Sequence, residues 1–92
     1  MQAIWNSVVI AESNDTIVVE GNHYFPFNSI KKEYFHKTEQ TTLCGWKGMA
    51  NYYSISVNGK TNKDCAWYYE EPNDAAMKIK GMVAFWNGVE VK

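Results

Sequence analysis

Short runs of apolar residues alternate with polar turns along the whole chain, and most runs have the length of a β-strand. Residues 7–12 and 16–20 are rich in β-branched side chains and flank a short polar segment, which predicts a hairpin. Near the other end, residues 82–86 and 89–91 flank Asn87-Gly88. This dipeptide favours a two-residue hairpin turn because both residues tolerate positive φ. The pattern therefore predicts antiparallel strands from end to end.

The central runs, 51–57 and 64–69, surround Asn58-Gly59. A two-residue turn there would place Ile55 opposite Asn62 and would mix an apolar row of side chains with a polar one. We therefore predict a loop with an odd number of residues, in which the glycine supplies the left-handed residue of a bulge. The apolar residues of both strands would then share one face.

Two short stretches have a helical pattern. Residues 28–35 begin with asparagine, a helix-capping residue, and residues 73–80 follow Pro72 and stop at Gly81. Each has about two turns, too few to be stable without packing on a sheet. The sequence thus predicts one mostly β domain over residues 1–92, with two short helices and a compact antiparallel rolled sheet or barrel.

Composition supports a single well-packed core, because 46% of the 92 residues are hydrophobic and 15% are aromatic. The formal net charge is -1, and all nine basic residues are lysines. A domain that reads duplex DNA usually carries a basic stripe with arginines, so we expect no duplex DNA partner. Stacking of a nucleotide or a single strand on aromatic side chains stays open.

The sequence gives three indications of where the protein works. It has no apolar run of about 18 residues, so we expect no membrane-spanning helix. Its first residues lack the basic-then-apolar layout of a secretory signal. Without such a signal, Cys44 and Cys65 are expected to be reduced thiols, and we expect a cytoplasmic protein.

Three stretches, 19–26, 44–53 and 66–69, together with Pro72 and residues 81–85, carry a family resemblance. They resemble a bacterial family, domain-of-unknown-function family four hundred and twenty-seven, which is sometimes labelled a nucleotidyltransferase. The resemblance covers nearly the whole chain. It implies a small β-rich fold similar to the β-tent of type B methionine sulfoxide reductases, and no firmly attached activity.

The family's usual pattern at its cysteine is Cys-Pro-aromatic-Lys-Gly. This chain matches at Cys44, Trp46, Lys47 and Gly48 and departs at Gly45, where the family usually has proline. Glycine loosens the backbone there, because it lacks the fixed φ of proline.

Cys44 and Lys47 form the first candidate for chemistry, since an ammonium group near a thiol stabilises the thiolate and makes it nucleophilic. The alternative is a packed cysteine beside a surface lysine, which is the commoner arrangement. Glu12 and Glu20 end apolar runs and could converge with His23 and Lys47 as acid, base or cation-binding groups. Such carboxylates are more often solvated or paired with lysine.

The aromatic residues divide into core and candidate site. Two-residue periodicity predicts that Tyr53, Trp67 and Tyr69 lie on an inner face, mainly as core. Trp46 lies in a glycine-flanked turn, where it either covers the core or lines a ligand cleft with Lys47 and Tyr24.

Metal chemistry has little support in the sequence. Structural zinc needs four ligands, typically in two close pairs, and the cysteines and histidines here are isolated. Nucleotidyl transfer needs metal ions held by paired carboxylates, and no Asp-x-Asp or Asp-x-Glu pair is present. We therefore expect no metal and no cofactor.

The sequence favours a binding domain for a small anionic or planar ligand. The expected pocket contains these residues: Tyr24, Cys44, Trp46, Lys47 and Trp67. Two alternatives stay open. One is an enzyme, either thiol-dependent or nucleotidyltransferase-like, with weak catalytic candidates in Cys44, Lys47, Glu12 and Glu20. The other is a module, monomer or homodimer, that pairs through an exposed edge strand.

Overall fold

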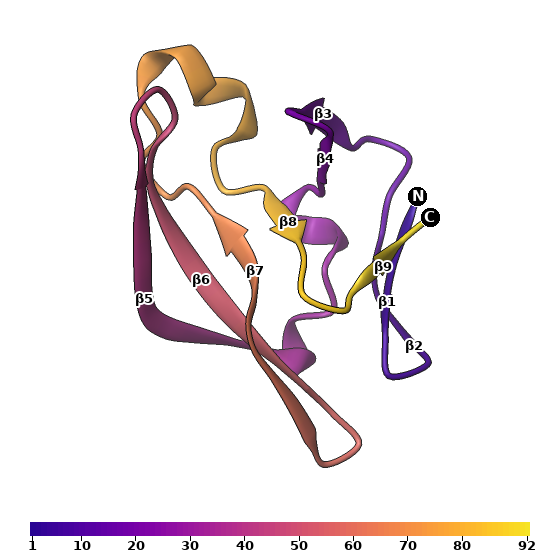
Figure 1. The fold of residues 1–92 in the computed structure, drawn as a ribbon. Coiled ribbons are helices and arrows are strands. Elements are labelled where there is room, and N and C mark those ends of the chain that lie inside the picture. The colour runs from indigo at the N-terminus through magenta and orange to yellow at the C-terminus, as the bar shows by residue number, and fades with distance from the viewer.

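Three antiparallel sheets make up the fold, and the computed structural model describes every residue, 1–92 (Figure 1). The four-stranded sheet contains, in spatial order, β5 (Phe35–Cys44), β6 (Gly48–Val57), β7 (Lys60–Tyr68) and β8 (Val83–Phe85). The three-stranded sheet contains β2 (Val8–Glu12), β1 (Gln2–Trp5) and β9 (Glu90–Val91). The third sheet is a two-stranded ribbon of β3 (Ile17–Val19) and β4 (Asn22–Tyr24). The predicted mostly β, antiparallel class is confirmed, and the sheets stay open rather than closing into a barrel.

The terminal hairpins differ from the prediction. Residues 7–12 and 16–20 do not pair, because β2 pairs with β1 and β3 pairs with β4. Asn87-Gly88 does form a turn with positive φ at both residues, 54° and 92°. This turn carries the chain from β8 in one sheet to β9 in the other, so it links two sheets instead of closing a hairpin. The local turn chemistry was right and the strand partners were wrong.

The predicted odd loop of the central hairpin is also wrong. Asn58-Gly59 forms a two-residue turn with φ of 51° and 79°, and Ile55 does face Asn62. The apolar rows come back into alignment further along β7, at an irregularity in the register. There Asp64 takes a φ of 54°, and Tyr53 comes to face an alanine. The bulge therefore lies within the strand and not at its turn.

Both predicted helices are short 3₁₀ segments. The first stretch is divided into η1 (Phe27–Ser29) and η2 (Lys32–Tyr34), because Ile30 between them is extended and bridges to Ala11. The second is η3 (Asp74–Ile79), which packs two buried side chains against the sheet.

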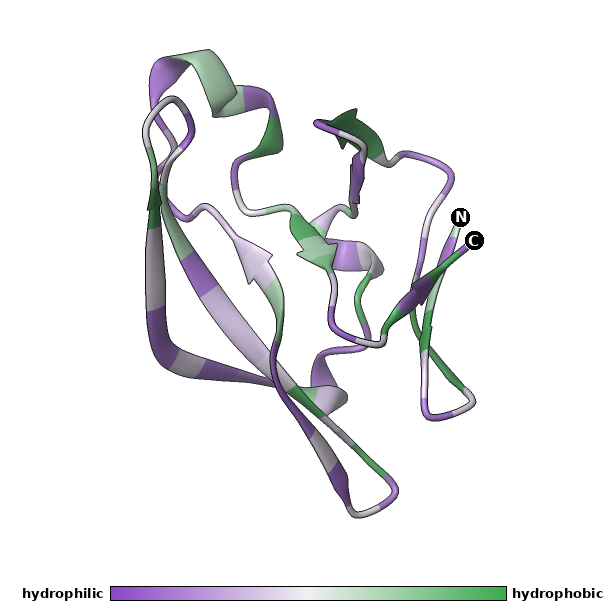
Figure 2. Ribbon diagram, viewed as in Figure 1, coloured by the Kyte–Doolittle hydropathy of each residue, from purple (hydrophilic) through white to green (hydrophobic).

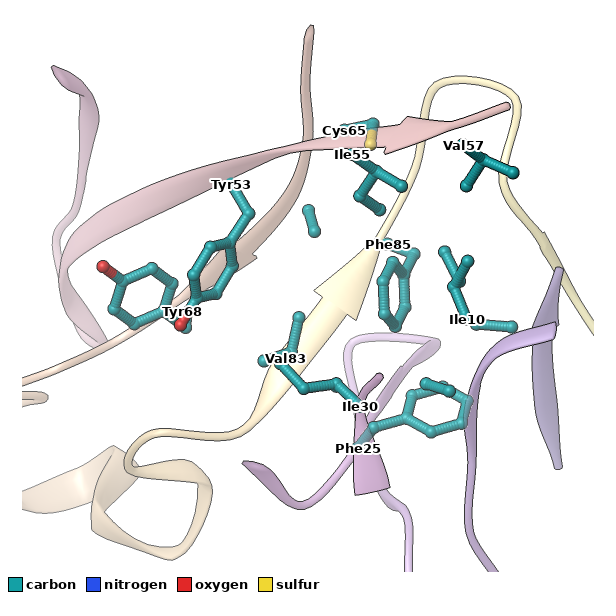
Figure 3. Packing of buried hydrophobic residues seen from close by; sticks show 13 residues of the cluster. Ile10, Phe25, Ile30, Tyr53, Ile55, Val57, Cys65, Tyr68, Val83 and Phe85 are labelled. Carbon is teal, nitrogen blue, oxygen red and sulfur yellow. The ribbon is translucent and has the colours of Figure 1, made fainter. Parts of the chain in front are cut away.

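Two clusters of buried residues lie on the two faces of the four-stranded sheet. The larger fills the space between this sheet and the three-stranded sheet, and Figure 3 shows its side chains, including Ile10, Ile55, Val83 and Phe85. The smaller covers the opposite face with the β3–β4 ribbon and η3. Figure 2 shows β8 as hydrophobic and β5 as mainly hydrophilic, which fits a buried strand at one edge and an exposed strand at the other.

The register separates two aromatic residues that the sequence placed together. Tyr53 pairs across the sheet with Ala66, whereas Trp67 pairs with Tyr52. Neighbours in a strand point to opposite faces, so Trp67 lies on the face opposite Tyr53. Tyr53 and Tyr69 are core residues, in the larger and the smaller cluster respectively. Trp67 is half-buried against the smaller cluster.

Candidate functional site

Lys47, in the loop between β5 and β6, is the one buried lysine of the nine. Only 8% of its side chain is exposed, and its ammonium group forms an ion pair with the Glu20 carboxylate. The nitrogen also lies 5.3 Å from the ring centroid of Trp46 and 5.7 Å from that of Tyr69. A buried cation is stable only where charge and polarisable rings compensate its lost hydration, and this loop supplies both.

Glu20 is the first residue of the two-residue turn between β3 and β4. Its φ is 54°, and the following Gly21 has a φ of 80°. Positive φ is uncommon for glutamate, so this backbone conformation costs free energy that glycine or asparagine would largely avoid. The same carboxylate also accepts a 3.4 Å hydrogen bond from Trp46 Nε1. The turn therefore aims an acidic side chain at the β5–β6 loop.

The ion pair shifts the pKa values of both partners. Burial is the largest single influence and lowers the pKa of Lys47, but the hydrogen bond to Glu20 and the interactions with Tyr24, Tyr69 and Cys44 together outweigh it, so the pKa lies above its usual value. The hydrogen bond from Lys47 is the main cause that lowers the pKa of Glu20, and Trp46 adds to it. Both groups are charged at neutral pH.

Asn73 holds the loop that carries Lys47. Its backbone N–H donates to the Lys47 carbonyl at 2.9 Å, and its side-chain amide donates to the carbonyls of Gly45 and Trp46 at 3.4 and 3.3 Å. A Cβ on Gly48, whose φ is 113°, would lie 3.3 Å from the Asn73 nitrogen. The glycine therefore lets the loop approach the segment before η3.

A cavity of about 250 Å³ opens beside Lys47 on this face of the sheet. Its walls are aromatic: Tyr52, Trp67, Tyr69 and Trp86. The small side chains of Thr42 and Ala50 complete it. We call this space the lysine cavity. It combines flat apolar walls with one buried cation.

The structure brings together most of the predicted site residues, although not all of them reach the cavity. Lys47 and Trp67 line it. Tyr24 is fully buried behind Trp67, accepts a 3.1 Å hydrogen bond from its indole N–H and packs edge-on against it. Trp46 is 42% exposed and lies outside the cavity wall, beside the ion pair.

Cys44 is half-buried and packs against the smaller cluster next to the loop. The hydrogen bond of the Lys47 ammonium goes to Glu20, so the lysine is engaged with a carboxylate and not with this thiol. Cys65 is fully buried, and burial raises its pKa to about 11. Both cysteines are free thiols.

Two further candidates lie elsewhere. Glu12 is exposed on the three-stranded sheet and accepts a hydrogen bond from Gln2 at 2.9 Å. His23 shares a hydrogen bond of 3.0 Å with Thr16 and neighbours Tyr24 on β4, so its ring points to the other face of the ribbon. No group of three or more His, Cys, Asp or Glu side chains converges in the molecule. None of its helices is long and apolar enough to cross a membrane.

The sequence reasoning missed three parts of the site. Tyr52 and Trp86 were not predicted as ligand contacts, and no role was predicted for Asn73, whose side-chain amide donates to the carbonyls of Gly45 and Trp46. The pairing of Tyr52 with Trp67 could have been found by allowing a bulge within β7 in place of an odd loop.

Fold and site together define a small antiparallel β domain with a lysine-bearing aromatic cavity. The chain belongs to the family described as Domain of unknown function (DUF427), whose model matches residues 1–92. The resemblance carried by the Cys44 and Trp67 stretches is thereby confirmed over the full length. No curated protein matches the chain.

Proposed function

We propose that this domain binds a small planar ligand in the lysine cavity, with an acidic or hydrogen-bond-accepting edge directed at Lys47. The observation that carries the proposal is the placement of the one buried lysine at a cavity with four aromatic walls. Ligand sites are typically apolar and aromatic, with a few polar groups that fix orientation. The lysine cavity has this composition.

The ammonium group has capacity left for a ligand. It carries three N–H donors, and one hydrogen bond goes to Glu20. A ligand acceptor can take a second donor without breaking the ion pair. A fully anionic ligand gains more attraction but also meets the negative charge of Glu20, so planarity and an acceptor matter more than net charge.

The size of the cavity limits the ligand. An engineered apolar cavity of about 150 Å³ holds benzene. The lysine cavity, at about 250 Å³, therefore has room for one ring or a small fused pair. Stacking on a tryptophan or tyrosine contributes about 1–3 kcal/mol per base in nucleic-acid complexes, and other flat rings stack for the same reason.

The test uses indole-3-carboxylate as the probe and follows backbone amide shifts by NMR. We expect saturable shifts at Lys47, Tyr52 and Trp67, and at least a roughly five-fold weaker dissociation constant in Lys47→Met. Methionine is unbranched like lysine and only slightly shorter, and Glu20 is exposed to solvent, so folding should be retained. Lys60→Met, at the exposed first residue of β7, is the matched control and should bind normally.

Two results would contradict the proposal. One is the absence of saturable shifts at these amides with either the acid or uncharged indole. The other is equal affinity of Lys47→Met and Lys60→Met, which would mean that the buried lysine contributes nothing to binding.

A further inference from the structure

A second cavity, on the opposite face of the four-stranded sheet, is separate from the lysine cavity. It has a volume of about 460 Å³, within the range of about 300–1,000 Å³ that is usual for small-molecule sites. Its lining combines aromatic and charged side chains: Phe27, Lys37, Tyr53, Tyr68, Glu70 and Lys80. We call it the tyrosine cavity.

Two tyrosines form the floor of this cavity. The rings of Tyr53 and Tyr68 are stacked, with centroids 4.5 Å apart and planes at 27°. Only 5% and 8% of these residues are exposed. Figure 3 shows the two rings side by side at one end of the larger cluster, with both oxygens turned away from Phe85.

Neither hydroxyl has a hydrogen-bond partner in the protein, whereas those of Tyr24 and Tyr52 do. No fully enclosed polar atom of the molecule lacks a partner, so both free hydroxyls must reach open space. The open space beside them is the tyrosine cavity. Two neighbouring O–H donors on residues more than nine-tenths buried are thus available to a ligand.

The charges around the cavity favour an anion. Lys37 and Lys80 line it, and Lys32 lies close by, with its ammonium 4.6 Å from the ring centroid of Phe27. Glu70 is the one acidic residue of the lining, so positive charge exceeds negative. Burial is the main cause that raises the pKa of Tyr53 to about 12, so at neutral pH its hydroxyl is protonated and can donate.

One wall of the cavity is apolar. Phe27, in η1, lines the cavity and is 48% exposed. An apolar group on the ligand would cover part of this ring. We propose that the tyrosine cavity binds a small organic oxyanion, with its charged oxygens at the two tyrosine hydroxyls and the lysines and its apolar body against Phe27.

The experiment titrates the protein with phenyl phosphate and, separately, with benzoate, and follows backbone amide shifts by NMR. We expect saturable shifts at Tyr53, Tyr68 and Gly81 with at least one probe below about 10 mM. The probe that binds more tightly identifies the preferred oxyanion. Inorganic phosphate should bind more weakly than phenyl phosphate, because it lacks the apolar body.

The decisive variant is the double substitution Tyr53→Phe with Tyr68→Phe. It keeps the stacked rings and removes only hydroxyls without protein partners, so the fold should be retained. We expect the dissociation constant to rise about five-fold or more. Lys37→Ala with Lys80→Ala should weaken binding similarly, and Lys78→Ala, an exposed lysine of η3 outside the lining, should not.

The proposal is overturned if neither probe gives saturable shifts at these amides, or if the double phenylalanine variant binds as tightly as the unchanged protein. Lys47→Met separates the two sites: it should weaken the binding that indole-3-carboxylate reports at Tyr52 and Trp67, and leave the shifts that phenyl phosphate causes at Tyr53, Tyr68 and Gly81 unchanged. Failure of the lysine cavity therefore does not affect the result for the tyrosine cavity.

Discussion

Both faces of the four-stranded sheet place polar groups among aromatic rings, but the two faces differ in whether those groups have partners within the protein. On the face of the lysine cavity, the polar groups are paired within the protein: Lys47 with Glu20, and Trp67 with Tyr24. On the face of the tyrosine cavity, the hydroxyls of Tyr53 and Tyr68 have no protein partner, and two exposed lysines stand nearby.

This difference has consequences for stability. A buried polar group that has a partner makes that partner dependent on it, because deleting one leaves the other unsatisfied. A hydroxyl that opens into a cavity can be deleted without such a loss. Removing a paired polar group on the face of the lysine cavity should therefore affect folding. Removing a free hydroxyl on the face of the tyrosine cavity should affect ligand binding instead.

The largest expected effect is a loss of stability at alkaline pH, to which both faces contribute. Burial is the main cause that raises the pKa of Tyr53 on one face and of Tyr69 on the other, each from 10.0 to about 12. The folded state then holds these protons more tightly than the unfolded state, so the stability is present below pH 10 and is lost as pH rises toward 12. Each group should account for at most about 2–3 kcal/mol, because solvent that reaches these hydroxyls screens part of the effect.

Urea unfolding at several pH values between about 9 and 12 measures this loss. Tyr53→Phe and Tyr69→Phe should each flatten the profile, and their effects should add because they lie on opposite faces. If the free energy of unfolding of Tyr53→Phe falls with pH as steeply as that of the unchanged protein, the Tyr53 hydroxyl is already solvated in the folded state.

The next effect concerns the loop that carries Lys47. Gly48→Ala places a Cβ 3.3 Å from the Asn73 nitrogen and 3.5 Å from the Glu71 carbonyl oxygen, at a φ of 113°. These contacts are with backbone atoms, which cannot rotate away, so we expect the free energy of unfolding to fall by about 2–4 kcal/mol. Gly45→Ala, with nothing within 4 Å of its Cβ, is the matched control and should change stability by less than about 0.5 kcal/mol.

A smaller effect on stability is expected from removing one tyrosine hydroxyl on each face. Tyr24→Phe leaves the indole N–H of Trp67 without its acceptor and should lower the free energy of unfolding by about 1–3 kcal/mol. Tyr53→Phe removes a hydroxyl without a protein partner and should lie within about 0.5 kcal/mol of the unchanged protein at pH 7. Equal losses in thermal unfolding would remove the distinction between the two faces.

The sequence predicted those features that depend on local chemistry. The strand-forming runs and the turn at Asn87-Gly88 follow from residue type and spacing. The strand partners did not follow. The two-residue turns at Asn6-Ser7 and Glu20-Gly21 each need positive φ at one residue that rarely adopts it, Ser7 or Glu20, so the local signal for these turns was weak.

The site was predicted in part for the same reason. The Lys47 loop is recognisable from its glycines, but the Glu20 counter-ion comes from a different sheet, and only the folded chain brings the two together. The bulge at Asp64 decides which side chains of β6 and β7 lie opposite each other. A one-residue shift moves every later side chain to the other face, and the predicted odd loop implied such a shift, so the prediction put Trp67 on the face of Tyr53.

The smallest change to the molecule tests why Lys47 tolerates its position. In Glu20→Gln the carboxylate is replaced by a neutral amide of the same shape. Burial, the largest single influence on this lysine, then acts without the opposing hydrogen bond to a charged group. The pKa of Lys47 should therefore move from above its usual value of 10.5 to below it. NMR titration of the lysine Cε resonance measures this shift directly.

The same substitution should alter stability at low pH. Because the pKa of Glu20 is lowered in the folded state, its ion pair stabilises the fold above the usual glutamate range and this stability is lost as pH falls through the lowered value. Glu20→Gln should remove that acid-dependent step while keeping the turn geometry. An unchanged acid profile, together with a Lys47 pKa still above 10.5, would show that the aromatic rings of Trp46 and Tyr69 hold the buried cation without help from the carboxylate.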